Sequence, residues 1–248
     1  MPQVPWALDV LGVPVAPLDL DRAVAHLEES LDAGERVFVI TANPEFVMLA
    51  RTDPTILERP AGTRVLVLPD GVGLVLAARL LGLPRFPGRA RGRDLVSRLA
   101  EVAARRRLAL FLLGAREGVA ARAGEALARR VPDLVIAGTH AGSADDDADG
   151  VARVAAAGPG ILLVAYGMPK QERWISRNLA HLPTVRIAVG VGGAFDYLAG
   201  EAPLPPEWMA RAGLEWLWRL VRQPWRWRRQ LALPAFFVLV LRERMRLI

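Results

Sequence analysis

The chain has 248 residues, 52% of them hydrophobic, a size that allows one large domain or one domain with an appendage. It contains no cysteine, which excludes disulfides, thiolate metal sites and a cysteine nucleophile and favours a reducing compartment such as the cytoplasm. The formal net charge is +6, and residues 203–248 hold nine arginines against three glutamates, so the whole net charge lies in this C-terminal segment.

Residues 1–202 alternate short aliphatic segments with longer helical patterns. Nearly continuous apolar strands that alternate with helices predict an α/β, Rossmann-like fold, in which a parallel sheet of about six strands is covered by helices on both faces. The predicted strands are Val37–Thr41, Arg64–Leu68, Leu108–Leu113, Leu134–Ala137, Gly160–Ala165 and Val185–Val189. The predicted helices are Asp19–Ala33, Pro44–Arg51, Val72–Leu81, Arg93–Arg107, Glu117–Arg130, Ala148–Ala157 and Lys170–Ala180.

A proline-rich stretch at 200–206 indicates a boundary, so we divide the chain into an α/β core, residues 1–202, and a C-terminal helical appendage, residues 203–248. In the appendage we predict helices at Glu207–Ala212 and Leu214–Arg222. A last helix is predicted from Pro224 to about Leu247, kinked or broken at Pro234. Its longest uncharged apolar run has eleven residues, too few to cross a bilayer, which takes about 20.

Five of the seven tryptophans lie within the twenty residues 208–227, with arginines between them. Indole rings favour the boundary between apolar and aqueous surroundings, and guanidinium groups favour phosphate. The appendage therefore predicts a surface that meets an anionic amphiphile, such as a membrane face or a lipid-linked phosphate. One alternative is a basic α/β protein that binds single-stranded nucleic acid through this segment, although its apolar neighbours favour lipid. Another is a purely structural subdomain with the tryptophans in a core.

Polar or glycine-rich residues follow each predicted strand, and ligands of doubly wound sheets bind at that edge. We therefore predict an active site there. Taken singly, Asp70 could instead cap the next helix, and Asn43 also has the pattern of a helix cap. The segment 190–193 departs from a dinucleotide fingerprint, because Phe195 replaces its last glycine, and favours a tight turn whose N–H groups face a phosphate. Three scattered histidines without carboxylates at metal spacing predict no metal site.

Five segments at ordered spacings carry a resemblance that covers nearly the whole chain. They are TANPE at 41–45, LPDGVG at 68–73, GMPKQERW at 167–174, VGVGGAFD at 189–196 and GLEWLWR at 213–219. Together they closely resemble the WecG/TagA/CpsF glycosyltransferases. The resemblance implies an inverting transferase that needs no metal or other cofactor and has no nucleic-acid partner.

The same resemblance implies the substrates and surroundings of the reaction. The donor is a UDP-sugar, often of N-acetylmannosamine or its uronate. The acceptor is polyprenyl-diphosphate-linked N-acetylglucosamine at the cytoplasmic membrane surface, in cell-surface polysaccharide or teichoic acid synthesis. It also implies that the core can self-associate into a homo-oligomer.

The resemblance further implies roles for individual residues. Asp70 matches the proposed general base, in keeping with the single carboxylate that takes the acceptor proton during inversion. Thr41 is expected beside the donor sugar, and a clamp of Arg219, Arg226 and Arg229 would stabilise the departing diphosphate. The residues expected to bind substrate are Asn43, Arg89, Gly114, His140, Gly167, Gln171, Gly192 and Gly193.

Overall fold

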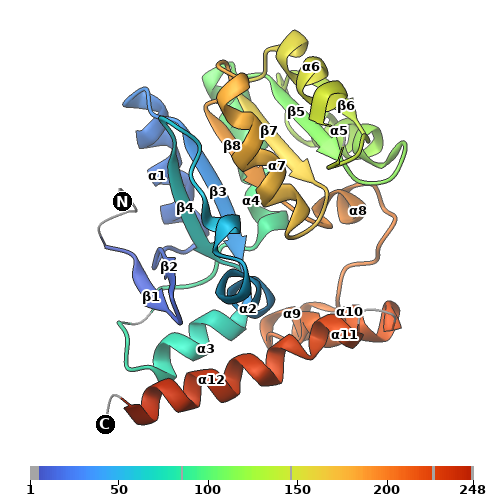
Figure 1. The fold of residues 1–248 in the computed structure, drawn as a ribbon. Helices are drawn as coiled ribbons and strands as arrows, with labels where there is room; N and C mark the ends of the chain where they lie inside the picture. Colours follow the sequence, from blue (N-terminus) through green and yellow to red (C-terminus); the bar gives the residue numbers. More distant parts are fainter. Residues whose placement is uncertain (1–5, 85, 146, 225–226, 247–248) are drawn as a thin grey trace.

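The computed structural model, which describes residues 6–84, 86–145, 147–224 and 227–246, is built around a six-stranded parallel sheet (Figure 1). All five strand pairs are parallel, and the order across the sheet is β4-β3-β8-β7-β5-β6. The predicted fold class is therefore confirmed. The strands are β3 (Val37–Ala42), β4 (Arg64–Pro69), β5 (Leu110–Gly114), β6 (Ile136–His140), β7 (Ile161–Ala165) and β8 (Ile187–Gly190).

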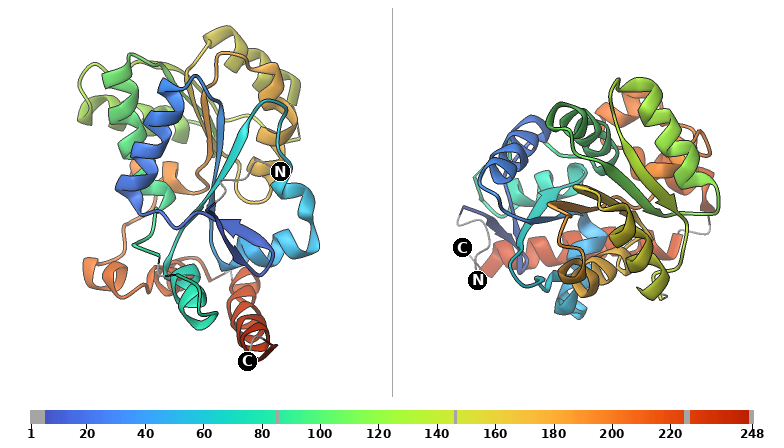
Figure 2. Two further views of the ribbon diagram at one scale, coloured as in Figure 1. Left: turned by 90° about the vertical axis from the view of Figure 1, so that its left-hand side faces the viewer. Right: turned by 90° about the horizontal axis from the view of Figure 1, so that it is seen from above.

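Helices cover both faces of this sheet, as the view along the layers in Figure 2 makes plain. Because side chains alternate across a strand, each strand supplies apolar groups to both faces, and two separate buried cores result. One face carries α2 (Pro44–Thr52), α3 (Val72–Leu80), α6 (Asp147–Ala157) and α7 (Lys170–Asn178), with the 3₁₀ turns η1 (Pro54–Leu57) and η2 (Leu179–His181). The other carries α1 (Leu20–Asp32), α4 (Gly92–Arg106), α5 (Val119–Arg130) and α8 (Ala194–Leu198).

Two features of the core differ from the sequence-based prediction. A short antiparallel hairpin of β1 (Leu8–Val10) and β2 (Val13–Val15) precedes the sheet and was not predicted. The predicted strand at 134–137 lies at 136–140 instead, so the segment Gly138–His140 belongs to β6 and not to the loop after it. Gly138 is required inside the strand, because a Cβ there would lie 2.6 Å from the ring of Phe111 on β5.

The appendage lies across the carboxyl ends of the strands (Figure 1) and contains α9 (Glu207–Arg211), α10 (Glu215–Arg222), α11 (Trp227–Gln230) and α12 (Ala232–Arg246). Helix α12 packs against α2 and α3 and buries Phe236 and Val240 completely. The region predicted as one last helix, kinked or broken at Pro234, is divided into α11 and α12, but the break is not at Pro234. Helix α12 begins two residues earlier, and in its first turn a proline removes no hydrogen bond; the chain turns at Leu231 instead.

The tryptophans of the appendage that the structure describes do not form a core, and Trp225 lies outside the described residues. Trp208 and Trp227 are 63% and 53% exposed, and α10 has no buried residue. These exposures contradict the interpretation of the tryptophans as the core of a structural subdomain. In the described ranges, no helix combines the length and apolarity needed to span a membrane.

Candidate active site

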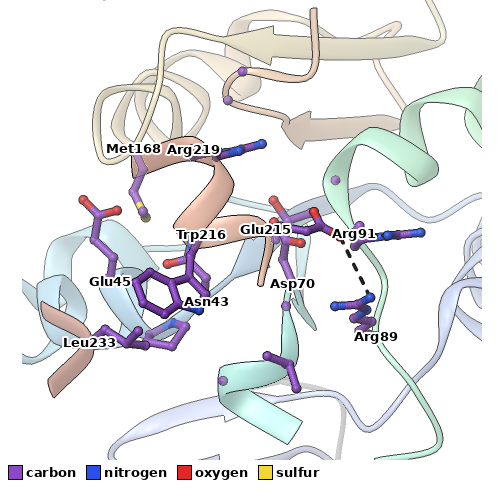
Figure 3. A pocket seen from close by; sticks show the side chains of 18 of the residues that line it. Asn43, Glu45, Asp70, Arg89, Arg91, Met168, Glu215, Trp216, Arg219 and Leu233 are labelled. Atoms are coloured by element: carbon purple, nitrogen blue, oxygen red, sulfur yellow. Dashed lines mark hydrogen bonds and ion pairs between the residues drawn. The ribbon is translucent and has the colours of Figure 1, made fainter. Parts of the chain in front are cut away.

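A pocket of about 550 Å³ lies between the carboxyl ends of β4, β3, β8 and β7 and the helices of the appendage (Figure 3). The site was predicted at this edge of the sheet, and most of the residues proposed for it line the pocket. Those residues are Thr41, Asn43, Asp70, Arg89, Gly167, Gln171, Gly192, Gly193, Arg219 and Arg229. Arg226 lies outside the described residues.

Two of the predicted substrate-binding residues lie elsewhere among the described residues. Gly114 ends β5 and His140 ends β6, the two strands beyond β7, and neither residue lines the pocket. Nε2 of His140 lies 2.8 Å from a carboxylate oxygen of Asp149 on α6. Gly114 has φ +100°, and a Cβ there would lie 2.8 Å from the carbonyl carbon of Ala165. Their assignment to substrate binding stays a prediction.

Asp70 follows β4 directly and lies in the middle of the pocket wall (Figure 3). It does not cap α3, because Gly71, with φ +99°, is the residue before that helix and no side chain caps it. Burial raises the pKa of Asp70 to about 6. Glu215 also raises this pKa, whereas Arg219, Arg91 and Arg93 oppose the shift. A carboxylate that is charged near neutral pH yet unusually basic is suited to accept a proton.

Thr41 and Asn43 shape the part of the pocket that follows β3. The hydroxyl of Thr41 donates a hydrogen bond of 3.1 Å to the carbonyl of Gly190, which joins the ends of β3 and β8. Oδ1 of Asn43 accepts the N–H of Phe46 at 2.9 Å, so Asn43 does cap α2, with Pro44 as the first helical residue. The cap and the pocket position are compatible, because the amide nitrogen of Asn43 is not needed for the cap.

Gln171 joins two of the pocket loops. Its Oε1 accepts the N–H of Gly167 at 3.1 Å and that of Gly192 at 2.9 Å. Gln171 thus connects the loop after β7 to the loop after β8 through these two N–H groups. Its Nε2 donates to Oε1 of Glu172 at 2.8 Å. Glu172 is 1% exposed and lines the pocket, and burial raises its pKa to about 7 against the opposing effect of the Gln171 hydrogen bond. Glu172 lies in the segment GMPKQERW at 167–174, but no role was predicted for it from the sequence.

The predicted arginines of the pocket connect the appendage to the core. Nε of Arg219 donates to the hydroxyl of Tyr197 at 2.8 Å, and its guanidinium lies 5.1 Å from the centre of that ring. Nε of Arg229 lies 2.6 Å from Oε1 of Glu45 on α2. Nη2 of Arg89 donates to a backbone carbonyl of α9 at 2.5 Å. All three guanidinium groups thus lie where the two parts of the chain meet.

Five charged residues that line this pocket had no role assigned from the sequence: Glu45, Glu172, Arg91, Arg93 and Glu215. Arg91 and Arg93 line it beside Arg89, and Glu215 of α10 lies opposite them. The available signal was the alternation of arginines at 89, 91 and 93, of which only the first was selected. The guanidinium-rich wall matches the charge and geometry of a phosphate or diphosphate group. No three histidine, aspartate or glutamate side chains within the described ranges are grouped so that they could hold a metal ion.

Comparison with known proteins identifies the family of this chain. The model of the Glycosyl transferase WecG/TagA/CpsF family matches residues 8–248. A protein of Bacillus spizizenii is 36% identical over 226 residues, 91% of this chain and 87% of the relative. One of Bacillus subtilis is 32% identical over 94% of this chain and 90% of the relative, and one of Staphylococcus aureus is 29% identical over 92% and 90%.

Each of these three relatives bears the name N-acetylglucosaminyldiphosphoundecaprenol N-acetyl-beta-D-mannosaminyltransferase. Nothing in the comparisons supports the alternative of a nucleic-acid-binding protein. A family match over almost the whole chain, with relatives above 30% identity, agrees with the resemblance of the five sequence segments. The protein therefore belongs to the WecG/TagA/CpsF family of glycosyltransferases.

Proposed function

We propose that this protein transfers N-acetylmannosamine, or a related hexose or uronate, from a UDP-sugar to N-acetylglucosamine linked to a polyprenyl diphosphate. The names of the relatives supply the sugar and the acceptor. The observation that carries the proposal is Asp70, an unusually basic carboxylate in a large pocket with several arginines. The product would enter cell-surface polysaccharide or teichoic acid synthesis.

The proposed reaction is a single displacement at the anomeric carbon. Asp70 accepts the proton of the acceptor hydroxyl while the hydroxyl oxygen forms its bond to C1 of the donor sugar. The bond between C1 and the UDP oxygen breaks at the same time, and UDP departs with the electron pair. Attack from the face opposite to the leaving group inverts the configuration at C1. One carboxylate is sufficient for this chemistry, whereas retention would need a second displacement.

Charge on the departing diphosphate must be stabilised, and we propose that arginines do this without a metal ion. Arg219 and Arg229 line the pocket, and Arg226 is predicted to join them. Guanidinium groups bind phosphate oxygens in pairs of parallel hydrogen bonds and remain charged at every physiological pH. Preformed donors directed at a developing negative charge are an efficient source of transition-state stabilisation.

We also propose that the appendage holds the enzyme on the cytoplasmic face of the membrane, where the lipid acceptor lies. Its exposed apolar side chains include Trp208, Trp227, Leu231, Val238 and Leu241, each more than half exposed. Arg228 and Arg229 of α11 lie between Trp227 and Leu231, and the arginines of α12 follow Leu241. Indole and aliphatic groups beside cations are typical of segments that lie in the headgroup region of anionic bilayers.

The central experiment is a transfer assay with a panel of UDP-sugars and a polyprenyl-diphosphate-GlcNAc analogue, with the lipid product identified by mass. We expect transfer from UDP-N-acetylmannosamine or a close analogue, an inverted anomeric centre by NMR, and undiminished turnover in EDTA. Full turnover of Asp70→Asn would refute the base assignment. A requirement for added Mg²⁺ would refute the role of the arginines in place of a metal.

Membrane association is tested separately by co-sedimentation with vesicles. We expect binding to vesicles that contain anionic lipid and weaker binding of a Trp208→Ser, Trp227→Ser variant, whose exposed indoles are removed. Equal recovery of both proteins in the supernatant would contradict this part of the proposal. Self-association stays a prediction, and light scattering of the purified protein measures it.

A further inference from the structure

Glu215, in the first turn of α10, is the carboxylate toward which three arginines of the core converge. Its Oε1 lies 2.8 Å from Nη1 of Arg91, 3.3 Å from Nη2 of Arg93 and 3.9 Å from Nη2 of Arg89 (Figure 3). The four side chains are only 15–26% exposed. Screening by solvent is therefore weaker here than in an exposed surface ion pair.

The arginines are also held from the core side. Asp94 of α4 lies 2.5 Å from Nε of Arg91 and 3.4 Å from Nε of Arg93. Arg91 and Arg93 thus lie between one carboxylate of the core and one of the appendage. Nη1 of Arg93 is buried and, within the described part of the chain, has no hydrogen-bond partner. The cluster therefore contains a buried guanidinium N–H for which the described residues provide no acceptor.

Glu215 has a geometric relation to the predicted clamp. Arg219 follows it by four residues on α10, and side chains four apart lie on the same face of a helix. The ion pairs of Glu215 therefore hold this face of α10 toward the core, which keeps Arg219 on the same side of the helix as Asp70. Tyr197 of α8 provides the second support of Arg219, through its hydroxyl and its ring.

The charged groups acting on Asp70 come from two directions. Arg219 and Glu215 belong to α10, and Arg91 and Arg93 belong to the segment that leads into α4. Glu215 raises the pKa of Asp70, and the three arginines lower it. Glu215 is thus the one charge in this set that makes the carboxylate more basic, while its ion pairs hold the opposing arginines in place.

We propose that Glu215 is a positioning residue for the transfer reaction, whose carboxylate gathers Arg91 and Arg93 and thereby holds α10, with Arg219, beside Asp70. The inference rests on the proposed function and deepens it, because it names the contact by which α10 is held against the core. It also assigns Arg91 and Arg93 to the anion-binding wall of the pocket, in addition to Arg89.

Two substitutions separate the charge of Glu215 from its position. Glu215→Gln keeps an oxygen that accepts from the arginines but removes the negative charge beside Asp70. We expect the acidic limb of its kcat–pH profile to move to lower pH. Glu215→Ala loses the contacts altogether, and we expect its plateau kcat to fall about 100-fold, the effect of misplacing a catalytic group by about 1 Å. The plateau of the Gln variant should lie above that of the Ala variant.

Glu28→Gln is the matched control. Glu28 of α1 also lies between two arginines of α4, at 3.1 Å from Arg105 and 3.4 Å from Arg106, and its side chain is 24% exposed, close to the 20% of Glu215. It does not line the pocket. We expect this variant to keep the wild-type kcat and pH profile.

A readout without turnover distinguishes failure of this inference from failure of the proposed function. The Asp70 carboxyl is titrated by carbon-13 NMR in substrate-free wild type and Glu215→Gln, and its pKa should be lower in the variant. If wild type transfers no sugar, the proposed function fails while this titration still tests the inference. An unchanged plateau kcat in Glu215→Ala, or a pKa of Asp70 that stays or rises in Glu215→Gln, would overturn the inference alone.

Discussion

Replacing Glu172 allows a direct measurement of how much a buried carboxyl group lowers the free energy of unfolding of this protein. Its side chain is 1% exposed, its Oε1 accepts from Gln171, and its Oε2 has no hydrogen-bond partner among the described residues. Burial raises its pKa from 4.5 to about 7. Because the folded-state pKa exceeds the unfolded one, the folded protein retains a proton that the unfolded chain has already released.

The sign and size of the effect follow from this difference. Below pH 4.5 Glu172 is protonated in both states, so it contributes no pH dependence to stability there. Between pH 4.5 and 7 stability falls as pH rises, by up to about 1.4 kcal/mol per pH unit. Above pH 7 the loss levels off at about 3 kcal/mol, a large part of the stability of an ordinary domain. Glu172→Gln, which does not titrate, avoids this loss.

The assay compares urea unfolding of wild type and Glu172→Gln at pH 5 and pH 8. The new amide has a donor where Oε2 lay, and an unpaired donor costs about 1–3 kcal/mol at either pH. The informative quantity is therefore how the difference in the free energy of unfolding between variant and wild type changes with pH. From pH 5 to pH 8 this difference should move by about 2–3 kcal/mol in favour of the variant. Glu125→Gln, at a 65% exposed side chain on α5, is the control and should show no such gain.

The reasoning would be refuted if the free energies of unfolding of wild type and Glu172→Gln differed by the same amount at pH 5 and pH 8. Such a result would mean that the Glu172 carboxyl titrates in the folded protein as it does in the unfolded chain. A lower stability of the variant at both pH values, by itself, would not refute it, because the unpaired amide donor predicts that offset.

Three further predictions concern the base, the appendage and the far end of the sheet. The kcat of wild type should rise with pH through about 6, as Asp70 loses its proton, and Asp70→Asn should lower kcat by about 10²–10⁴-fold; a flat profile would contradict this. Gly213→Ala should destabilise the protein by about 1–3 kcal/mol in urea unfolding and lower kcat, because φ is +76° and the new Cβ would lie 2.5 Å from Cγ1 of Val72; unchanged stability and kcat would refute it. Arg36→Met should cost about 2–4 kcal/mol in urea unfolding, because its guanidinium donates to three carbonyls in and after η2, yet leave kcat unchanged where the protein is folded; a wild-type urea midpoint would contradict it.

The fold was predictable because its signals are local. Strands such as β3 and β7 are continuous aliphatic runs, and the helices between them are amphipathic over nine or more residues. The hairpin of β1 and β2 has strands of only three residues, and Leu11 adopts φ +56° in its turn. Neither length nor composition distinguishes so short a pair from a loop. Its stability comes from packing against the sheet, which the local sequence does not record.

The site was predictable as an edge of the sheet but not as a pocket. Every parallel strand ends at the same edge, so residues such as Asp70, Gln171 and His140 were equally eligible. Strand order decides among them, and it depends on contacts between distant segments. Because β5 and β6 lie beyond β7, neither Gly114 nor His140 lines the pocket, whereas β4, β3, β8 and β7 are consecutive neighbours whose ends do.

The appendage completes the pocket for a reason that no single motif could reveal. Arg229 and the carbonyl of Ala210, which accepts from Arg89, both belong to the appendage and face the core. The appendage is held against the core near its C-terminus by Phe236 and Val240 of α12, which are fully buried. Nearer its start it is held by the ion pairs of Glu215.

Asp70 and the arginines at 89, 91 and 93 lie on the core, whereas Arg219 and Arg229 lie on the appendage, so the pocket is complete only where the two parts meet. The arginines that line it are Arg89, Arg91, Arg93, Arg219 and Arg229, and the carboxyl groups that line it are those of Glu45, Asp70, Glu172 and Glu215. Asp94 pairs with Arg91 from outside the pocket, so the arginines are balanced by carboxyl groups of the chain itself. A diphosphate that contacts arginines of both core and appendage would strengthen the contact between them, because it binds the docked arrangement and stabilises it.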